Sequence, residues 1–244
     1  MRVLTAIPVY NEAKHVQGVL AEVRRYSPDI LVVNDGSTDG TAALLDREQG
    51  LHRIDHPANR GYGAALISAF SFALERDFDV LVTMDCDGQH EPARIPVLLE
   101  AIHDCDIVSG SRYYRDFRQD TPAPTDRRFI NATITRELNA RYGFDLTDTF
   151  CGFKAYRREA LEKLHITERG WGMPLQLWVQ AARQELRVKE IGVPRLYLDP
   201  NRAFGGVMND PEQRLAYYRG VIEAAERDTL PIRSESCCHC PGTR

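Results

Sequence analysis

Two carboxylates one residue apart, Asp85 and Asp87, are the residues of this sequence best suited to chemistry. They follow directly on an apolar run, residues 80–84, whose β-branched side chains predict a buried strand. Side chains of an extended chain repeat every second residue, so both carboxylates point the same way. Gln89 continues that spacing with a neutral oxygen, and Gly88 lets the chain turn tightly beside them. Hard oxygen ligands in this arrangement predict a site for Mg²⁺ or Mn²⁺.

Three interpretations of this acidic segment compete. It fits a polar turn whose aspartates cap a helix that starts near Pro92. It also fits a phosphatase of the haloacid-dehalogenase type, in which a strand likewise ends in Asp-x-Asp, although those enzymes have Thr or Val where Gln89 stands here. The third interpretation is a divalent-metal site that binds a diphosphate. The remaining motifs must decide among the three.

The elements that position these residues alternate between apolar strands and amphipathic helices. Strands are expected at residues 3–9, 30–33, 51–55, 80–84, 107–108 and 188–193, with an aromatic-rich strand after Asp148. Strands that are apolar throughout and flanked by helices indicate a mostly parallel, twisted sheet covered on both faces. Trp178 is expected in the core. We therefore expect an α/β fold, a single Rossmann-like domain over residues 1–230, and a disordered tail at residues 231–244.

Polar loops follow two more of these strands, at the edge where open α/β sheets bind ligands. Asp35 stands directly after the strand at residues 30–33 and is placed to accept hydrogen bonds from the N–H edge of a nucleobase. Gly61 and Gly63 precede a helix, where they would let an anionic ligand approach the N–H groups of its first turn. The sequence has no Rossmann or Walker phosphate-binding pattern at this place.

Charge and cysteine content narrow the functional class. The 244 residues carry a formal net charge of −4, which argues against nucleic-acid binding because that needs a basic face. The chain begins directly in an expected strand, so we expect no signal peptide. Its most apolar stretch, residues 64–74, is too short to span a bilayer. Three of the six cysteines lie in the tail, from Cys237 to Cys240, where a frayed terminus explains them better than a metal or a lipid. We expect a reducing, cytoplasmic location.

Five segments, taken in order, resemble one family. They are residues 7–12 (IPVYNE), 32–41 (VVNDGSTDGT), 59–65 (NRGYGAA), 84–90 (MDCDGQH) and 110–113 (GSRY). Together they resemble the family 2 inverting glycosyltransferases, and within these the branch of dolichol-phosphate mannose synthases and related polyprenyl-phosphate sugar synthases. The resemblance extends over about residues 1–206.

This resemblance implies a GT-A fold and the transfer of mannose or glucose from GDP-mannose or UDP-glucose to a polyprenyl or dolichyl phosphate, with Mg²⁺ or Mn²⁺ as cofactor. By position in the motifs, nucleotide binding is implied for Pro8, Tyr10, Glu12, Asp35, Gly61 and Asp85. Metal binding is implied for Asp85, Asp87 and Gln89. Arg112 and Asp148 are implied near the transferred sugar and the acceptor, and Arg202 at the acceptor phosphate. Catalysis would depend on Asp85, Asp87, Arg112, Asp148 and Arg202.

The sequence departs from the family pattern at places that concern the acceptor more than the donor. Many relatives have Phe-x-x-Glu where residues 173–176 read Met-Pro-Leu-Gln, and residues 206–208 replace the usual Ser-Lys. None of the C-terminal membrane helices of some relatives is expected here. The resemblance therefore implies a cytoplasmic protein without a transmembrane segment that works peripherally at the membrane.

Three functional hypotheses follow. A polyprenyl-phosphate acceptor is largely an anion at neutral pH, because the second pKa of a phosphate monoester is about 6, and it needs little help from a base. A soluble or protein-bound hydroxyl acceptor would need a base, for which Asp148 is the candidate. The third hypothesis is a non-catalytic sugar-nucleotide-binding module, against which the presence of both Asp85 and Asp87 counts. The phosphatase interpretation fails on Gln89 and on the position of Asp85 far inside the chain. A nucleotidyltransferase would have a glycine- and arginine-rich first loop, which this chain lacks.

Overall fold

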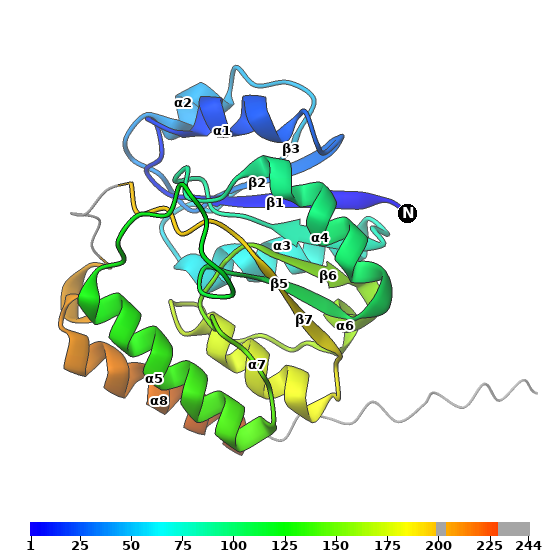
Figure 1. The fold of residues 1–244 in the computed structure, drawn as a ribbon. Coiled ribbons are helices and arrows are strands. Elements are labelled where there is room, and N and C mark those ends of the chain that lie inside the picture. The colour runs from blue at the N-terminus through cyan, green and yellow to red at the C-terminus, as the bar shows by residue number, and fades with distance from the viewer. Residues whose placement is uncertain (199–203, 229–244) are drawn as a thin grey trace, which may run out of the picture.

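In the part of the chain that the computed structural model describes, residues 1–198 and 204–228, seven strands form one mixed sheet (Figure 1). The strands are β1 (Val3–Val9), β2 (Asp29–Asn34), β3 (His52–Asp55), β4 (Val80–Thr83), β5 (Ile107–Ser111), β6 (Lys154–Arg157) and β7 (Val188–Gly192). Their spatial order is β3-β2-β1-β4-β6-β5-β7. Every neighbouring pair is parallel except the two that include β6. The prediction of a mostly parallel α/β sheet is confirmed, whereas the reversed direction of β6 was not predicted.

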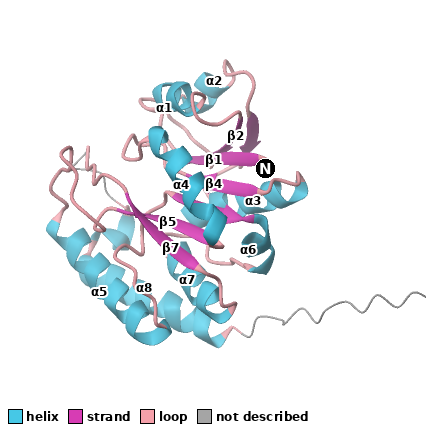
Figure 2. Ribbon diagram, turned by 45° about the vertical axis from the view of Figure 1, so that its right-hand side comes forward, coloured by secondary structure: helices cyan, strands magenta, loops and turns pink. Residues whose placement is uncertain are grey.

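Helices cover both faces of this sheet. They are α1 (Val16–Val23), α2 (Thr41–Leu45), α3 (Tyr62–Glu75), α4 (Ile95–Ala101), α5 (Thr125–Tyr142), α6 (Arg158–Lys163), α7 (Met173–Arg183) and α8 (Pro211–Arg227), with short 3₁₀ turns η1 (Pro92–Arg94), η2 (Ile102–Asp104) and η3 (Gly206–Asn209). One core contains residues of α1, α2 and α4, and the other contains residues of α3, α5, α6, α7 and α8. Figure 2 shows α5, α7 and α8 gathered beside β5 and β7. Among the described helices, none is both long and apolar enough to cross a membrane.

Successive residues of a buried strand belong to opposite cores. In β2, Leu31 and Val33 pack with the core that contains α3 and α7, while Ile30 and Val32 pack with the core that contains α1 and α4. This alternation follows from the two-residue repeat of an extended chain. It explains why residues 30–33 of this strand are all apolar, since both of its faces are covered.

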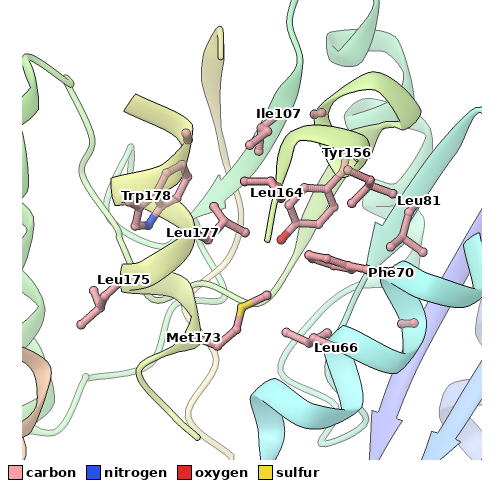
Figure 3. Close-up of a cluster of buried hydrophobic side chains, with 14 of the residues drawn as sticks. Leu66, Phe70, Leu81, Ile107, Tyr156, Leu164, Met173, Leu175, Leu177 and Trp178 are labelled. Carbon is pink, nitrogen blue, oxygen red and sulfur yellow. The ribbon is translucent and has the colours of Figure 1, made fainter. Parts of the chain in front are cut away.

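The larger core lies between α3 and α7 (Figure 3). Phe70 of α3 meets Tyr156 of β6 edge-on, with ring centroids 5.1 Å apart. Trp178 of α7 is fully buried, as predicted, and its indole N–H donates to the Thr149 carbonyl at 2.9 Å. The buried indole therefore has the hydrogen-bond partner that its polar nitrogen needs. This packing brings the segment that precedes α7 against the start of α3.

The carboxyl ends of β1, β2 and β4 meet at one edge of the sheet. Val9, the last residue of β1, pairs with Asn34, the last residue of β2. Thr83, the last residue of β4, pairs with Ala6 of β1, three residues before Val9. Because these strands are parallel, the polar segments that follow them leave the sheet at the same edge. The tertiary structure thus brings together motifs that the sequence separates by tens of residues.

Candidate active site

A cleft of about 740 Å³ opens at this edge of the sheet. Its volume falls within the range typical of small-molecule sites. Nine of the predicted site residues line it: Pro8, Tyr10, Glu12, Asp35, Gly61, Asp85, Asp87, Gln89 and Arg112. Asp148 is fully buried behind the cleft wall, and Arg202 lies outside the described residues, as does the tail from Cys237 to Cys240.

The acidic pair lies in a loop that is closed by its own hydrogen bonds. Asp87 accepts two of them from Gln89, one from the backbone N–H at 3.0 Å and one from the side-chain amide at 2.8 Å. The backbone N–H of Asp85 donates to His90 Nδ1 at 3.0 Å. The Asp85 carboxylate accepts from the Tyr62 hydroxyl at 3.2 Å. The segment is therefore a hydrogen-bonded polar turn, but neither aspartate caps the helical turn that starts at Pro92, and both line the cleft.

These oxygen donors fit a small divalent cation. Within the described residues there is no group of three or more His, Cys, Asp or Glu side chains that would form an all-protein metal cage. Mg²⁺ is usually bound by one or two carboxylates, with substrate phosphates and water completing its shell. Asp85 and Asp87 provide the two carboxylates on the cleft surface, and Gln89 adds an amide beside them. The donor set is that of a site completed by a substrate diphosphate.

Asp35 has more partners than the sequence predicted. Its Oδ1 accepts from His56 Nδ1 at 2.6 Å and from the N–H of Arg60 at 3.0 Å, while its Oδ2 accepts from the N–H of Gly61 at 2.9 Å. The other ring nitrogen of His56 lies 2.9 Å from Ser68 Oγ. A carboxylate has about four acceptor positions, so three are used by the protein and one is left for a base. Asp35 mainly holds the loop of residues 60–61 beside the cleft.

Gly61 and Gly63 serve a purpose different from the predicted one. The N–H of Ala64, in the first turn of α3, donates to the Arg169 carbonyl at 3.0 Å. A Cβ at Gly61 would overlap that same carbonyl, and a Cβ at Gly63 would overlap the carbonyl of Glu168. The backbone of residues 168–170 therefore occupies the space beside this helix start, and Gly61 also lines the cleft. Gly61 also has φ of 100°, which a residue with a side chain rarely adopts.

Arg112 and Asp148 form a buried ion pair. Arg112 Nε lies 2.6 Å from Asp148 Oδ2, and Nη2 lies 2.9 Å from Oδ1. Asn131 donates to the same carboxylate at 2.6 Å. Burial alone would raise the pKa of Asp148, but the charge of Arg112 and hydrogen bonds from Arg112 and Asn131 outweigh it and lower the pKa to about 2. The expectation that Asp148 is a general base is corrected, because its oxygens are occupied and out of reach of an acceptor.

The opposite end of the cleft is lined by aromatic and arginine side chains that the sequence analysis did not single out as a site. Arg127 lies 4.7 Å from the Phe204 ring centroid and Arg214 lies 4.6 Å from it. Arg214 is buried and pairs with Asp126. Arg127 lies in the first turn of α5 and Arg214 in α8, and neither belongs to a motif that the sequence analysis used. These side chains give the cleft one cationic, partly apolar end.

The chain matches the family model described as "Glycosyl transferase family 2" over residues 5–165. It belongs to glycosyl transferase family 2. Two family relatives are similar over most of their length. An undecaprenyl-phosphate mannosyltransferase of Micrococcus luteus is 34% identical, and the match covers 86% of this chain and 90% of the relative's chain. A polyprenol monophosphomannose synthase of Mycolicibacterium smegmatis is 33% identical, and the match covers 79% of this chain and 76% of the relative's chain.

Solved structures of similar fold include glucosyl-3-phosphoglycerate synthase from Mycobacterium tuberculosis. Its complex with uridine diphosphate has a TM-score of 0.68 at 16% identity, covering 92% of this chain and 79% of the other. The complex with Mn²⁺, uridine diphosphate and glucosyl-3-phosphoglycerate has a TM-score of 0.67. At this identity the likeness concerns the fold, and it confirms the GT-A fold that the motifs implied.

Gln176, which stands where the family resemblance implied Glu, holds the segment before α7 through its side chain. The Gln176 side-chain oxygen accepts from the backbone N–H groups of Thr167 and Glu168, both at 2.8 Å. Its amide donates to the Thr167 hydroxyl at 2.8 Å. All polar atoms of this buried side chain thus serve the segment before α7. Gln176 is a structural residue in this family member.

Proposed function

We propose that this glycosyltransferase is inverting and transfers a hexose from a nucleotide sugar, GDP-mannose or UDP-glucose, to a polyprenyl or dolichyl phosphate. One observation carries the proposal. A single cleft is lined by the carboxylates of Asp85 and Asp87, which follow β4, and β4 lies in the sheet between β1 and β2, which lead to Tyr10 and Asp35, and β5, which leads to Arg112. Two relatives more than 30% identical over most of their length are named an undecaprenyl-phosphate mannosyltransferase and a polyprenol monophosphomannose synthase.

The proposed nucleotide end of the cleft, after β1 and β2, supplies an aromatic surface and hydrogen-bonding groups. Tyr10 is 45% exposed, so its ring is free to pack on a base. Pro8 and Glu12 line the same end, and Glu12 is buried there. Asp35 offers its one remaining acceptor position to the base edge, while Gly61 shapes the loop beside it. These residues orient the donor with its diphosphate toward the acidic pair.

The acidic pair and Gln89 are proposed to hold Mg²⁺ or Mn²⁺, with Asp85 and Asp87 as the carboxylate ligands. A divalent cation bound there neutralises the charge that grows on the departing diphosphate. The protein contributes a loop whose carboxylates are already oriented by hydrogen bonds, so little reorganisation is needed when substrate enters.

The acceptor phosphate is proposed to bind beside Arg112, with Arg202 as a second cation from the segment outside the described residues. One of its oxygens attacks the anomeric carbon from the face opposite the diphosphate. The new carbon–oxygen bond forms as the bond to the diphosphate breaks, and the electron pair leaves with the diphosphate. No proton has to be removed from a phosphate dianion. This agrees with Asp148 being engaged with Arg112 and not free to act as a base.

Because this acceptor is a lipid, we place the protein at the cytoplasmic surface of a membrane as a peripheral protein. The test is transfer by the purified protein from GDP-mannose and UDP-glucose in parallel, to a polyprenyl phosphate and to a matched polyprenol without phosphate. Product is expected only with the phosphate. Transfer to the free alcohol or to a soluble sugar instead would establish the hydroxyl-acceptor alternative. Nucleotide-sugar binding without any transfer would establish a non-catalytic module.

A further inference from the structure

Tyr62 and Trp171 form an aromatic pair in the wall of the cleft. Their rings are stacked, with centroids 5.3 Å apart and planes 14° apart. Tyr62 is the first residue of α3, and Trp171 lies in the segment before α7, so the pair joins two separate elements. Trp171 remains 38% exposed, which marks it as part of the cleft surface and not of the core.

The hydroxyl of Tyr62 extends from this stack to the acidic pair. It donates to Asp85 Oδ1 at 3.2 Å. Gly152 leaves the space for this contact, because a Cβ there would lie 2.6 Å from the Tyr62 hydroxyl and 2.8 Å from the Asp85 carboxylate. Tyrosine and carboxylate are thus packed together against one stretch of backbone.

Trp171 itself is held in place from α7 and α8. Glu168 accepts from the N–H of Gly170 at 2.6 Å and from the hydroxyl of Tyr217 at 2.7 Å. The side chain of Gln176 fixes the same segment from α7. The position of the indole is therefore set by the helices behind it, and through the stack the indole limits how the ring of Tyr62 can move.

We propose that Tyr62 is a positioning residue for the divalent cation, with its hydroxyl orienting the Asp85 carboxylate and Trp171 holding its ring in place. The inference rests on the proposed function, since it takes Asp85 as a ligand of that cation. A hydrogen bond to a ligating carboxylate restricts its rotation before the cation arrives. Such outer partners of metal ligands typically change affinity or activity by about 10- to 100-fold when removed.

The test is Mn²⁺ binding, followed by the electron paramagnetic resonance signal of the free ion. Tyr62→Phe keeps the ring and removes only the hydroxyl, and it should bind Mn²⁺ about 10-fold more weakly. The matched control is Tyr142→Phe, which removes a hydroxyl that donates to the Glu226 carboxylate at 2.6 Å, at the contact of α5 and α8. It should bind Mn²⁺ as the parent does. In turnover, the KM for Mn²⁺ should rise in Tyr62→Phe while kcat at saturating Mn²⁺ stays close to that of the parent.

Trp171→Leu tests the second half of the inference. If the indole acts through Tyr62, it should weaken Mn²⁺ binding in the parent but add nothing in the Tyr62→Phe background, since coupled residues are non-additive. Equal Mn²⁺ affinity of Tyr62→Phe and Tyr142→Phe overturns the role of the hydroxyl, and additive losses overturn the role of the indole. A parent that binds no Mn²⁺ even with a nucleoside diphosphate present, or an Asp87→Ala variant that binds it equally well, would instead overturn the proposed metal site.

Discussion

Arg112 and Asp148 face each other through two parallel hydrogen bonds, of 2.6 and 2.9 Å, across 36 residues of sequence. The Asp148 side chain is 0% exposed and the Arg112 side chain is 17% exposed. The carboxylate is thus buried, whereas the guanidinium reaches the cleft. This geometry makes Asp148 the group that orients the Arg112 guanidinium at the cleft, and it leaves Asp148 unsuited to accept a proton.

Replacing Asp148 by Asn should destabilise the protein strongly. The substitution keeps the shape but leaves the charge of Arg112 without its partner, and loss of one member of a buried pair costs about 3–5 kcal/mol. The matched control is Asp106→Asn, which breaks an ion pair with Arg187, whose side chain is 64% exposed. An exposed pair contributes about 1 kcal/mol or less. Urea unfolding measures both, and equal losses would contradict a structural role for the buried pair.

The same pair predicts how stability depends on pH. The pKa of Asp148 is lowered to about 2 in the folded protein, so its contribution is fully present above the pKa of the unfolded chain and is lost as pH falls toward the folded pKa. Between pH 5 and pH 3 the parent should lose about 1 kcal/mol more than Asp148→Asn, which cannot titrate at this position. The free energy of unfolding from urea titrations at the two pH values checks this. Parallel losses in both proteins would show that the carboxyl does not have the lowered pKa.

Removal of the proposed cation should abolish transfer. Chelation by EDTA should stop turnover, and added Mn²⁺ or Mg²⁺ should restore it. Asp87→Ala should lower turnover by at least about 100-fold, because a carboxylate ligand of a diphosphate-bound cation is lost. Asp77→Ala, which breaks an exposed ion pair with Arg158, is the control and should leave turnover unchanged. The metal role is wrong if Asp87→Ala turns over and binds nucleotide as well as the parent does.

Gly63→Ala should disturb the junction of α3 with the segment before α7. The added methyl group would overlap the Glu168 carbonyl and lie 2.9 Å from Met173 Cβ, and overpacking of this kind costs about 1–3 kcal/mol. Gly220→Ala is the matched control, because Gly220 lies within α8 with open space around it. That change should stabilise the protein by up to about 1 kcal/mol. Thermal unfolding midpoints that shift in the same direction in both variants would contradict the close approach.

Local patterns predicted the frame of this molecule well. The strands that lead to Asp35 and Asp85 contain apolar runs, residues 30–33 and 80–82, because both faces of the sheet are covered, and such runs can be recognised in the sequence alone. The short strand β6 was harder to place. Its pattern indicates an extended segment, but its direction depends on the chain reversals before it, which carry no periodic signal.

From the sequence alone follow the parallel α/β frame, the carboxylates of Asp85 and Asp87 after a buried strand, and the family. These depend on residues a few positions apart, whose geometry is set by the repeat of the backbone. Only the tertiary structure shows that Asp148 pairs with Arg112. It also shows that the backbone of residues 168–170 lies beside Gly61, where a ligand was expected. It shows, finally, that Trp171 stacks on Tyr62, whose hydroxyl contacts Asp85. Each of these contacts joins elements that only packing of the core brings together, so the spacing of residues along the chain does not predict them.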